Sequence, residues 1–196
     1  MHGRSTKSNE VYNWVDVNNE SAFFRATEFL IDLGHRSIAL LNGMADLDFA
    51  IRRTKGYERA LSKHQIDLVS DYILYGEMTE PYGYRSTIAL LDRPSPPTAI
   101  IASSILVANG VRRGVEELGL KMGRDISILS HDDDLSYFRD ESDVPVYSVT
   151  RSSVREAGYK SADLLIKTIE DPTRQCEGIL IEADLMVGTS TKPAKS

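Results

Sequence analysis

The chain has 196 residues, which is enough for one large domain or for two small lobes with a hydrophobic core. Its formal net charge of −6 argues against a nucleic-acid surface, because binding to phosphates depends on clustered Lys and Arg. The single cysteine, Cys176, excludes an internal disulfide and a cysteine-based metal cluster, and it fits a reducing compartment. The sequence has no apolar stretch of membrane-spanning length and no signal-peptide pattern at its start, so we expect a cytoplasmic protein without a membrane partner.

The first half of the chain alternates between strand and helix patterns. Asn18 or Asn19 is a candidate cap for a helix that ends at Gly34, since Phe23, Ala26 and Leu30 recur at helical spacing. The patterns predict strands over 11–17, 37–43 and 71–75, and further helices over 48–64 and 81–92.

The most informative stretch runs from Pro97 to Asp134. An apolar strand, a helix that stops at Gly119 and a second apolar strand over 126–130 predict two parallel strands joined by a helix. His131 and the acids Asp132, Asp133 and Asp134 follow the second strand. In open α/β sheets, ligands bind outside the carboxyl ends of the strands, so this pattern predicts a polar small-molecule pocket.

The rest of the chain continues the alternation. It predicts an extended segment over 144–150, a helix over 153–170, one strand region over 177–188 and a polar tail. Strands that alternate with helices indicate a parallel sheet covered on both faces.

Several motifs occur together in a characteristic order. They are WVDVNN, LGHRSIALLNG, RRTKGYERAL, PPTAIIASS followed by ANG, LGLKMGRDISIL with its Asp pair, and ADLMVGTST. This ordered set resembles the lactose/galactose repressor family of bacterial transcription regulators over roughly residues 11 to 191. Val187 stands where the family's final motif usually has Arg.

The resemblance implies a fold class and a division of the chain. We expect a periplasmic-binding-protein-like α/β fold with two lobes of Rossmann-type parallel sheets, of which the first is truncated. The expected division is a polar leader (1–10), a remnant of the first lobe (11–34 and 151–178), the second lobe (35–150 and 179–191) and a tail (192–196). The family's DNA-binding headpiece and the start of its first lobe have no counterpart in this sequence.

The family binds sugars or related polar molecules between its lobes, which implies a set of effector contacts here. Arg53 matches the arginine that meets the effector, and its planar fork of donors suits neighbouring hydroxyls. Asp132 matches the pocket aspartate, whereas Asp133 and Asp134 fit a loop or a helix cap better. The alternatives are a surface arginine beside Arg52 and a solvated turn acid.

Three further positions are effector candidates with structural alternatives. Phe49, four residues before Arg53, could stack on a sugar ring or pack in the core. Asp16 matches a position near the cleft between the lobes, and otherwise ends a strand. Met78 lies on the loop that caps the pocket in relatives, and otherwise belongs to an ordinary surface loop.

The family pattern is broken next to this site. Most relatives have Asn-Asp where this chain has Ser104 and Ile105, so Ser104 remains an effector candidate but the identity of the effector does not transfer. His131 is a pocket donor or a strand-end histidine. Arg151, Ser152 and Ser153 are expected to form a hinge, with Ser152 or Ser153 also capping the next helix.

These features predict the ligand-sensing and dimerisation core of a sugar-responsive repressor. Its partners would be a sugar or glycoside, a second copy bound through the helix after Ser104 and residues 135–138, and operator DNA through the absent headpiece. Catalysis, a cofactor and a metal are not expected, because nucleophile, phosphate-loop and zinc-ligand motifs are missing. The alternatives are a periplasmic-type sugar-binding protein and an α/β enzyme acting on a sugar-like substrate.

Overall fold

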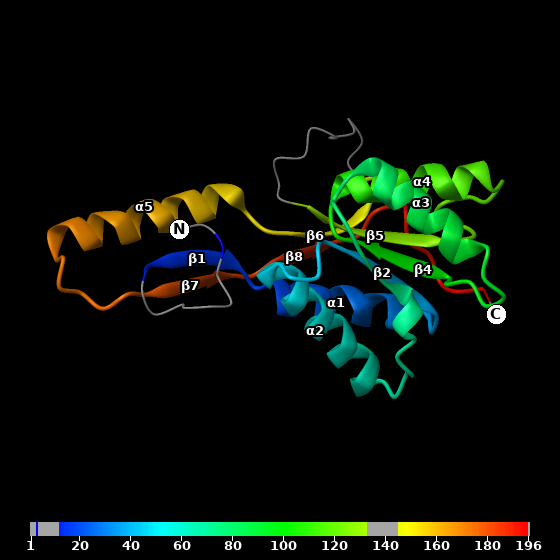
Figure 1. Cartoon of the computed structure of the whole chain (residues 1–196), viewed down its shortest axis with the longest axis horizontal. Coiled ribbons are helices and arrows are strands. Elements are labelled where there is room, and N and C mark those ends of the chain that lie inside the picture. The colour runs from blue at the N-terminus through cyan, green and yellow to red at the C-terminus, as the bar shows by residue number, and fades with distance from the viewer. Residues whose placement is uncertain (1–2, 4–11, 133–144, 196) are drawn as a thin grey trace.

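The protein folds around two separate β-sheets. The structure, a computed structural model, describes Gly3, residues 12–132 and residues 145–195, with Asp132 described by its backbone alone. One sheet has six strands in the order β3-β2-β4-β5-β6-β8, and the other pairs β1 with β7 (Figure 1). The strands are β1 (Trp14–Val17), β2 (Ile38–Asn42), β3 (Ile73–Tyr75), β4 (Ala99–Ala102), β5 (Ser127–Asp132), β6 (Ser148–Arg151), β7 (Gly178–Ile181) and β8 (Asp184–Met186).

Helices cover both faces of the six-stranded sheet. The helices are α1 (Asn19–Asp32), α2 (Asp48–Lys63), α3 (Glu80–Leu91), α4 (Ile105–Glu117) and α5 (Val154–Glu170). Helices α1 and α2 pack on one face and α3 and α4 on the other, and we call this unit the larger lobe (Figure 1). Its strands are parallel except β8, which runs antiparallel to β6. Apolar residues on both sides of each strand explain why both faces need a helical cover.

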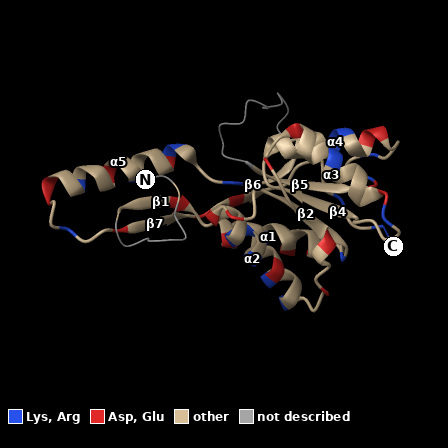
Figure 2. Ribbon diagram, viewed as in Figure 1, with Lys and Arg blue, Asp and Glu red and all other residues tan. Residues whose placement is uncertain are grey.

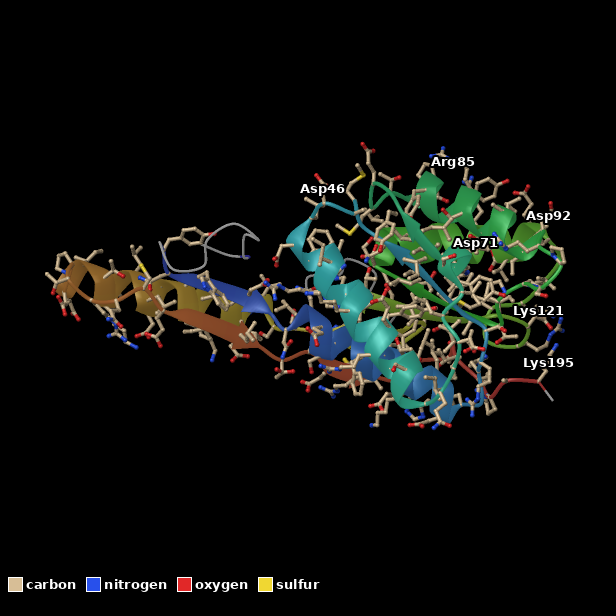
Figure 3. The ribbon with its side chains drawn as sticks, turned by 60° about the horizontal axis from the view of Figure 1, so that its bottom comes forward. Asp46, Asp71, Arg85, Asp92, Lys121 and Lys195 are labelled. Carbon is tan, nitrogen blue, oxygen red and sulfur yellow. The ribbon has the colours of Figure 1, made fainter. Side chains whose placement is uncertain are left out.

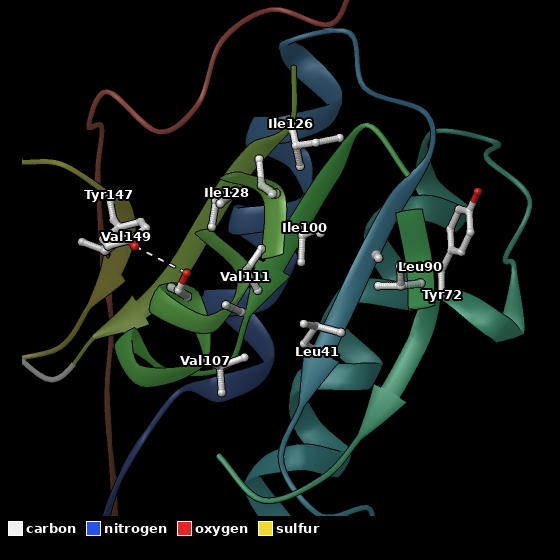
Figure 4. Packing of buried hydrophobic residues seen from close by; sticks show 14 residues of the cluster. Leu41, Tyr72, Leu90, Ile100, Val107, Val111, Ile126, Ile128, Tyr147 and Val149 are labelled. Atoms are coloured by element: carbon white, nitrogen blue, oxygen red, sulfur yellow. Dashed lines mark hydrogen bonds between the residues drawn. The ribbon is translucent and has the colours of Figure 1, made fainter. Parts of the chain in front are cut away.

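The core on the α3–α4 face follows the alternation of side chains along the strands. Leu41, Ile100 and Ile128 come from three adjacent strands and meet Val107 and Val111 of α4 (Figure 4). On the opposite face, Leu40, Ile101 and Leu129 meet α1 and α2. Successive residues of a strand therefore contribute to two cores, one on each face of the sheet.

Glycines set how closely the helices approach each other. A Cβ on Gly56 of α2 would lie 2.2 Å from the carbonyl oxygen of Glu20 on α1. A Cβ on Gly110 of α4 would lie 2.0 Å from the carbonyl oxygen of Glu80 on α3. Each pair of helices thus packs backbone to backbone, which larger residues at these positions would prevent.

The second unit, which we call the smaller lobe, consists of β1, β7 and α5. It projects from the larger lobe, with α5 lying along the two-stranded sheet (Figure 1). Its core is a small cluster of Val15, Ala157, Leu164 and Ile181. Apolar residues on the other side of α5 face solvent, namely Tyr159, Leu165, Ile166 and Ile169.

The expected division of the chain differs from this packing at two boundaries. The sequence predicts residues 11–34 in the first lobe, yet α1 packs on the six-stranded sheet through Phe23, Ala26 and Leu30. It also predicts one strand region over 177–188, with a lobe boundary after 178. This region forms β7 in the small sheet and β8 in the large one, because the chain crosses between the lobes at Glu182 and Ala183.

Other expectations agree with the structure. Asn18 caps α1 by accepting a hydrogen bond from the Ser21 N–H at 3.2 Å, and Gly34 and Gly119 adopt positive φ after their helices. The α/β class, with a mostly parallel sheet covered by helices on both faces, is confirmed. The segment 71–75 is a strand only from Ile73, because Ser70–Tyr72 form a 3₁₀ turn.

His35, from the GHR motif, has a structural role at the far end of the large sheet from the cleft. Its Nδ1 lies 2.8 Å from the Thr98 hydroxyl, and its Nε2 lies 3.0 Å from both the Ser127 hydroxyl and the Lys192 carbonyl. These contacts join the starts of β4 and β5 to the C-terminal segment. Burial lowers the pKa of His35, because the charged imidazolium would be desolvated there.

Charged residues of both signs are interspersed over the surface (Figure 2). Arg85, Asp92, Lys121 and Lys195 lie at the outer margin of the larger lobe (Figure 3). Among the described residues, no helix is both long and apolar enough to cross a membrane.

Candidate functional site between the two lobes

A cleft of about 740 Å³ lies where the two lobes meet. The carboxyl ends of β4 and β5 and the N-terminal turns of α2 and α4 form its side on the larger lobe. The ends of β1 and β7 and the start of α5 form its other side. This volume falls in the range of small-molecule sites, and the carboxyl ends of parallel strands are where open α/β sheets bind ligands.

Most of the residues predicted for the site line this cleft. They are Asp16, Phe49, Arg53, Met78, Ser104, His131, Ser152 and Ser153. They come from segments far apart in the sequence and are brought together by the crossings between the lobes.

Arg53 is held at the base of the cleft by polar and aromatic contacts. Its Nε donates to the Asn19 side-chain oxygen at 2.8 Å, and its Nη1 donates to the Ser103 carbonyl at 2.9 Å. The guanidinium carbon lies 4.8 Å from the centre of the Phe23 ring and 4.7 Å from that of Phe49. The fork is therefore fixed in direction before any ligand binds, which lowers the entropic cost of a contact.

Arg53 remains a cation although it is 7% exposed. Burial lowers the pKa of Arg53 to about 9, and the charge of Asp16 acts in the opposite direction. At neutral pH the guanidinium is thus charged, and Asp16, at the end of β1, supplies the opposite charge from the smaller lobe. A surface arginine, the alternative interpretation, does not fit this burial.

His131 is a neutral group beside Arg53. It is buried, and its Nδ1 lies 2.9 Å from the Thr150 hydroxyl of β6. Burial lowers the pKa of His131 well below its usual 6.5, and the nearby Arg53 charge lowers it further. The imidazole can therefore offer a hydrogen bond without adding charge.

Phe49 and Met78 form an apolar part of the wall. Both lie next to Gly43, where a Cβ would meet the Phe49 ring at 2.7 Å and the Met78 Cγ at 3.8 Å. Phe49 is half-buried, with its ring against the Arg53 guanidinium. It thus packs on the protein and lines the cleft, so both interpretations of this residue describe part of its environment.

Ser104 has a defined structural task at the cleft. As N-cap of α4, its side chain accepts a hydrogen bond from the Val107 N–H at 3.3 Å. Ser103, one residue earlier, is 2% exposed and also lines the cleft. Ile105 and Leu106 follow on the wall, so the break in the family pattern makes this side of the cleft more apolar.

The acid cluster can be placed only in part. The Asp132 backbone ends β5 and pairs in register with Arg151, which brings it to the same end of the sheet as His131. The Asp132 side chain, Asp133, Asp134 and the expected dimer segment 135–138 lie outside the described residues.

The predicted hinge lies on one of three crossings between the lobes. Residues 151–153 connect β6 to α5, and the Ser153 side chain caps α5 by accepting from the Glu156 N–H at 3.2 Å. The other two crossings run beside each other. The Asn18 amide donates to Glu182 at 2.6 Å, and the Asn18 N–H donates to the Ile181 carbonyl at 2.8 Å.

The sequence interpretation missed Asn19, Ser103 and the Asn18–Glu182 contact. Asn19 looked like a helix cap, but its side-chain oxygen binds Arg53 and its amide donates to the Val17 carbonyl at 3.1 Å. The available signal was a second asparagine directly after a capping asparagine. A long-range contact such as Asn18 to Glu182 leaves no local pattern in the sequence.

The arrangement suits the binding of a neutral polar molecule with apolar patches. It combines a charged fork, a carboxylate, a neutral imidazole, hydroxyls and an aromatic ring. Within 12–132 and 145–195, no group of three or more His, Cys, Asp or Glu is arranged to hold a metal ion.

Comparisons with known proteins agree with this geometry. The family profile described as "Periplasmic binding protein-like domain" matches residues 27–191. The HTH-type transcriptional regulator AglR of Rhizobium meliloti is 42% identical over 194 residues, covering 99% of this chain and 54% of the regulator. The chain thus spans about half the length of the curated relatives that it matches.

Two solved structures extend the comparison. A regulatory protein of the LacI family from Chloroflexus aggregans superposes with a TM-score of 0.86 at 32% identity, over 97% of this chain and 67% of that one. A complex of the transcriptional regulator CelR with cellobiose superposes with a TM-score of 0.87 at 27% identity, over 96% and 57% of the two chains.

Proposed function

Because the chain belongs to the periplasmic binding protein-like domain family, among the LacI-type transcription regulators, we propose that it is the effector-binding core of a sugar-responsive transcriptional regulator. The cleft between the lobes takes the effector. The observation that carries this proposal is the buried, charged and pre-oriented Arg53 at the base of a cleft of about 740 Å³.

Each cleft residue has a proposed role that follows from its chemistry. Arg53 donates to effector hydroxyls, and Asp16 and Asp132 accept from them. Phe49 and Met78 cover the apolar C–H faces of the sugar. Ser104 and His131 add neutral polar contacts from the ends of β4 and β5.

The effector acts by changing the angle between the lobes. Arg53 belongs to the larger lobe and Asp16 to the smaller one, so a ligand that contacts both favours the closed arrangement. The hinge of Arg151, Ser152 and Ser153 adjusts together with the crossings at Asn18 and Glu182. The effector couples the cleft to a distant site because it binds the closed form more tightly than the open form.

In the full regulator, that distant site is a DNA-binding headpiece that reads an operator in the cytoplasm. The printed names of the relatives, HTH-type regulators and repressors, support this part of the proposal. A homodimer is formed through α4 and residues 135–138. Sedimentation at tens of micromolar should show a dimer, and a monomer would contradict this assignment.

The names of the relatives favour a regulator over a periplasmic-type sugar-binding protein, which shares the fold. We propose no catalytic step, because the cleft residues serve recognition.

A thermal-shift screen with D-glucose, D-ribose and cellobiose tests the proposed function. A sugar present at about 100 times its Kd should raise the Tm by roughly 5–10 °C, since it binds only the folded state. Arg53→Ala and Asp132→Ala should each abolish the shift.

Arg59→Ala is the matched control, because it removes the same charge from the same helix outside the cleft. Arg59 contacts Glu20 at 2.6 Å, and neither residue lines the cleft. Circular dichroism verifies that each variant is folded, and Asp16→Asn provides a second cleft variant if Arg53→Ala unfolds. Shifts that survive in Arg53→Ala and Asp16→Asn would reject the assigned site.

A further inference from the structure

We propose that Ser103 determines effector specificity, by bonding its hydroxyl to a hydroxyl of the effector beside Arg53. The inference rests on the proposed function, because it concerns the same cleft. Among the described residues, Ser103 carries a buried side-chain oxygen without a hydrogen-bond partner, although the residue lines the cleft. A buried polar group without a partner destabilises a protein, so its presence at a ligand site points to a partner that arrives with the ligand.

Three neighbouring hydroxyls at this end of the sheet have protein partners. Ser104 accepts from the Val107 N–H, Ser153 accepts from the Glu156 N–H, and Thr150 meets His131. Each of these three hydroxyls has one contact that holds its oxygen in place and can still make another. The Ser103 hydroxyl has no such contact, so it would gain its first partner when an effector binds.

The backbone fixes where this hydroxyl lies. The Ser103 N–H donates to the Leu41 carbonyl at 2.9 Å, and the Ser103 carbonyl accepts from Arg53 Nη1 at 2.9 Å. Side chains alternate along a strand, so Ser103 lies on the same face as Ile101, which packs toward α1 and α2. Arg53 projects from α2 onto that face.

A ligand atom that meets Ser103 therefore lies close to the guanidinium as well. An oxygen satisfies both groups, because it accepts from Arg53 and a hydroxyl can also pair with Ser103. A C–H group at the same place would leave the buried Ser103 hydroxyl without a partner. Ser103 thus discriminates against effectors that lack this one hydroxyl.

The ligand-free proteins provide the first test, with two adjacent serines as a matched pair. Ser104→Ala removes a cap and should lower the Tm by roughly 2–4 °C. Ser103→Ala should leave the Tm unchanged or raise it, because it removes an unpartnered group. A fall of the Tm in Ser103→Ala as large as that in Ser104→Ala would assign the hydroxyl a structural role and overturn the proposal.

Calorimetry with D-glucose, D-ribose and cellobiose provides the second test. Any of these sugars that binds the wild type should bind Ser103→Ala about tenfold more weakly. One monodeoxy analogue of that sugar should bind the wild type more weakly than the sugar does, by about the same factor. Ser103→Ala should bind this analogue no more weakly than the wild type does. A Kd that Ser103→Ala leaves unchanged would overturn the proposal while the effector-binding function stands.

If none of the three sugars binds the wild type, the sugar-binding function itself is contradicted. The Tm comparison then still decides whether the Ser103 hydroxyl has a structural role.

Discussion

The two lobes differ in how many apolar residues each buries in its own core. The larger lobe buries two apolar clusters, one on each face of its sheet, under two pairs of closely packed helices. The described part of the smaller lobe has two strands and one helix around four buried apolar residues. Most groups at the base of the cleft, including Arg53, His131 and Ser103, belong to the larger lobe.

This difference has a functional consequence. We expect the larger lobe to keep the polar groups of the cleft in position and the smaller lobe to change its angle more easily. Elements with few buried contacts are those that open or move most easily in proteins. We therefore expect the stability of the chain and the orientation of the cleft to come from the larger lobe.

The largest expected effect is on the free energy of unfolding, when one isoleucine in each lobe is truncated to alanine. Ile101 of β4 is 0% exposed, so Ile101→Ala should destabilise the protein by about 2–5 kcal/mol through a cavity. Ile169 of α5 is 69% exposed, and Ile169→Ala should change the free energy of unfolding by less than about 0.5 kcal/mol. Urea denaturation measures both, and equal effects would remove the contrast between the lobes.

A pair of glycines sharpens the same comparison. Gly56→Ala places a Cβ against the Glu20 carbonyl and should cost about 1–3 kcal/mol, because α1 and α2 must separate. Gly158 of α5 has no atom within 4 Å of an added Cβ, so Gly158→Ala should stabilise the protein by up to about 1 kcal/mol through helix propensity.

The glycine pair also tests the geometry of the site. Gly56 lies one turn after Arg53, and α1 carries Asn19, which binds Arg53. Gly56→Ala should therefore weaken effector affinity together with stability, whereas Gly158→Ala should leave affinity unchanged. Retained affinity in Gly56→Ala would show that helix spacing does not position Arg53.

The smallest expected effect is a dependence of stability on pH. Burial lowers the pKa of both His35 and His131 in the folded state, so the unfolded chain binds more protons below its usual histidine pKa of 6.5. Stability should therefore fall as the pH falls from 7 to 5.5. His131→Asn, with a polar side chain that does not titrate, should reduce that dependence.

Urea titrations at the two pH values would check this prediction. An unchanged pH dependence in His131→Asn would mean that His131 titrates alike in the folded and unfolded states.

Local sequence patterns predicted the helices and strands well, because apolar spacing and terminating residues lie within or next to each element. The spacing of Phe23, Ala26 and Leu30 predicted α1, and the motif before Gly119 predicted α4. The same patterns could not assign α1 to a lobe, because an apolar stripe does not indicate which sheet the helix packs on. The strand region after Glu177 was divided wrongly for the same reason, since β7 and β8 differ only in their partners.

The cleft shows the same limit at the level of single residues. A family motif pointed to Arg53, helical spacing pointed to Phe49 and a position after a strand pointed to His131, and all three residues line one cleft. The family pattern pointed to Ser104 and nothing in the sequence marked Ser103, although the Ser104 hydroxyl caps a helix and the Ser103 hydroxyl is buried without a partner. That distinction depends on the direction of each side chain, which requires the fold.

A crystal structure determined with the sugar that gives the largest thermal shift tests the central claim most directly. Our account predicts electron density for the sugar between the lobes, with an oxygen within hydrogen-bond distance of Arg53 and with Asp16 drawn toward it. Density at another surface, or an empty cleft at a concentration that saturates binding in calorimetry, would contradict it.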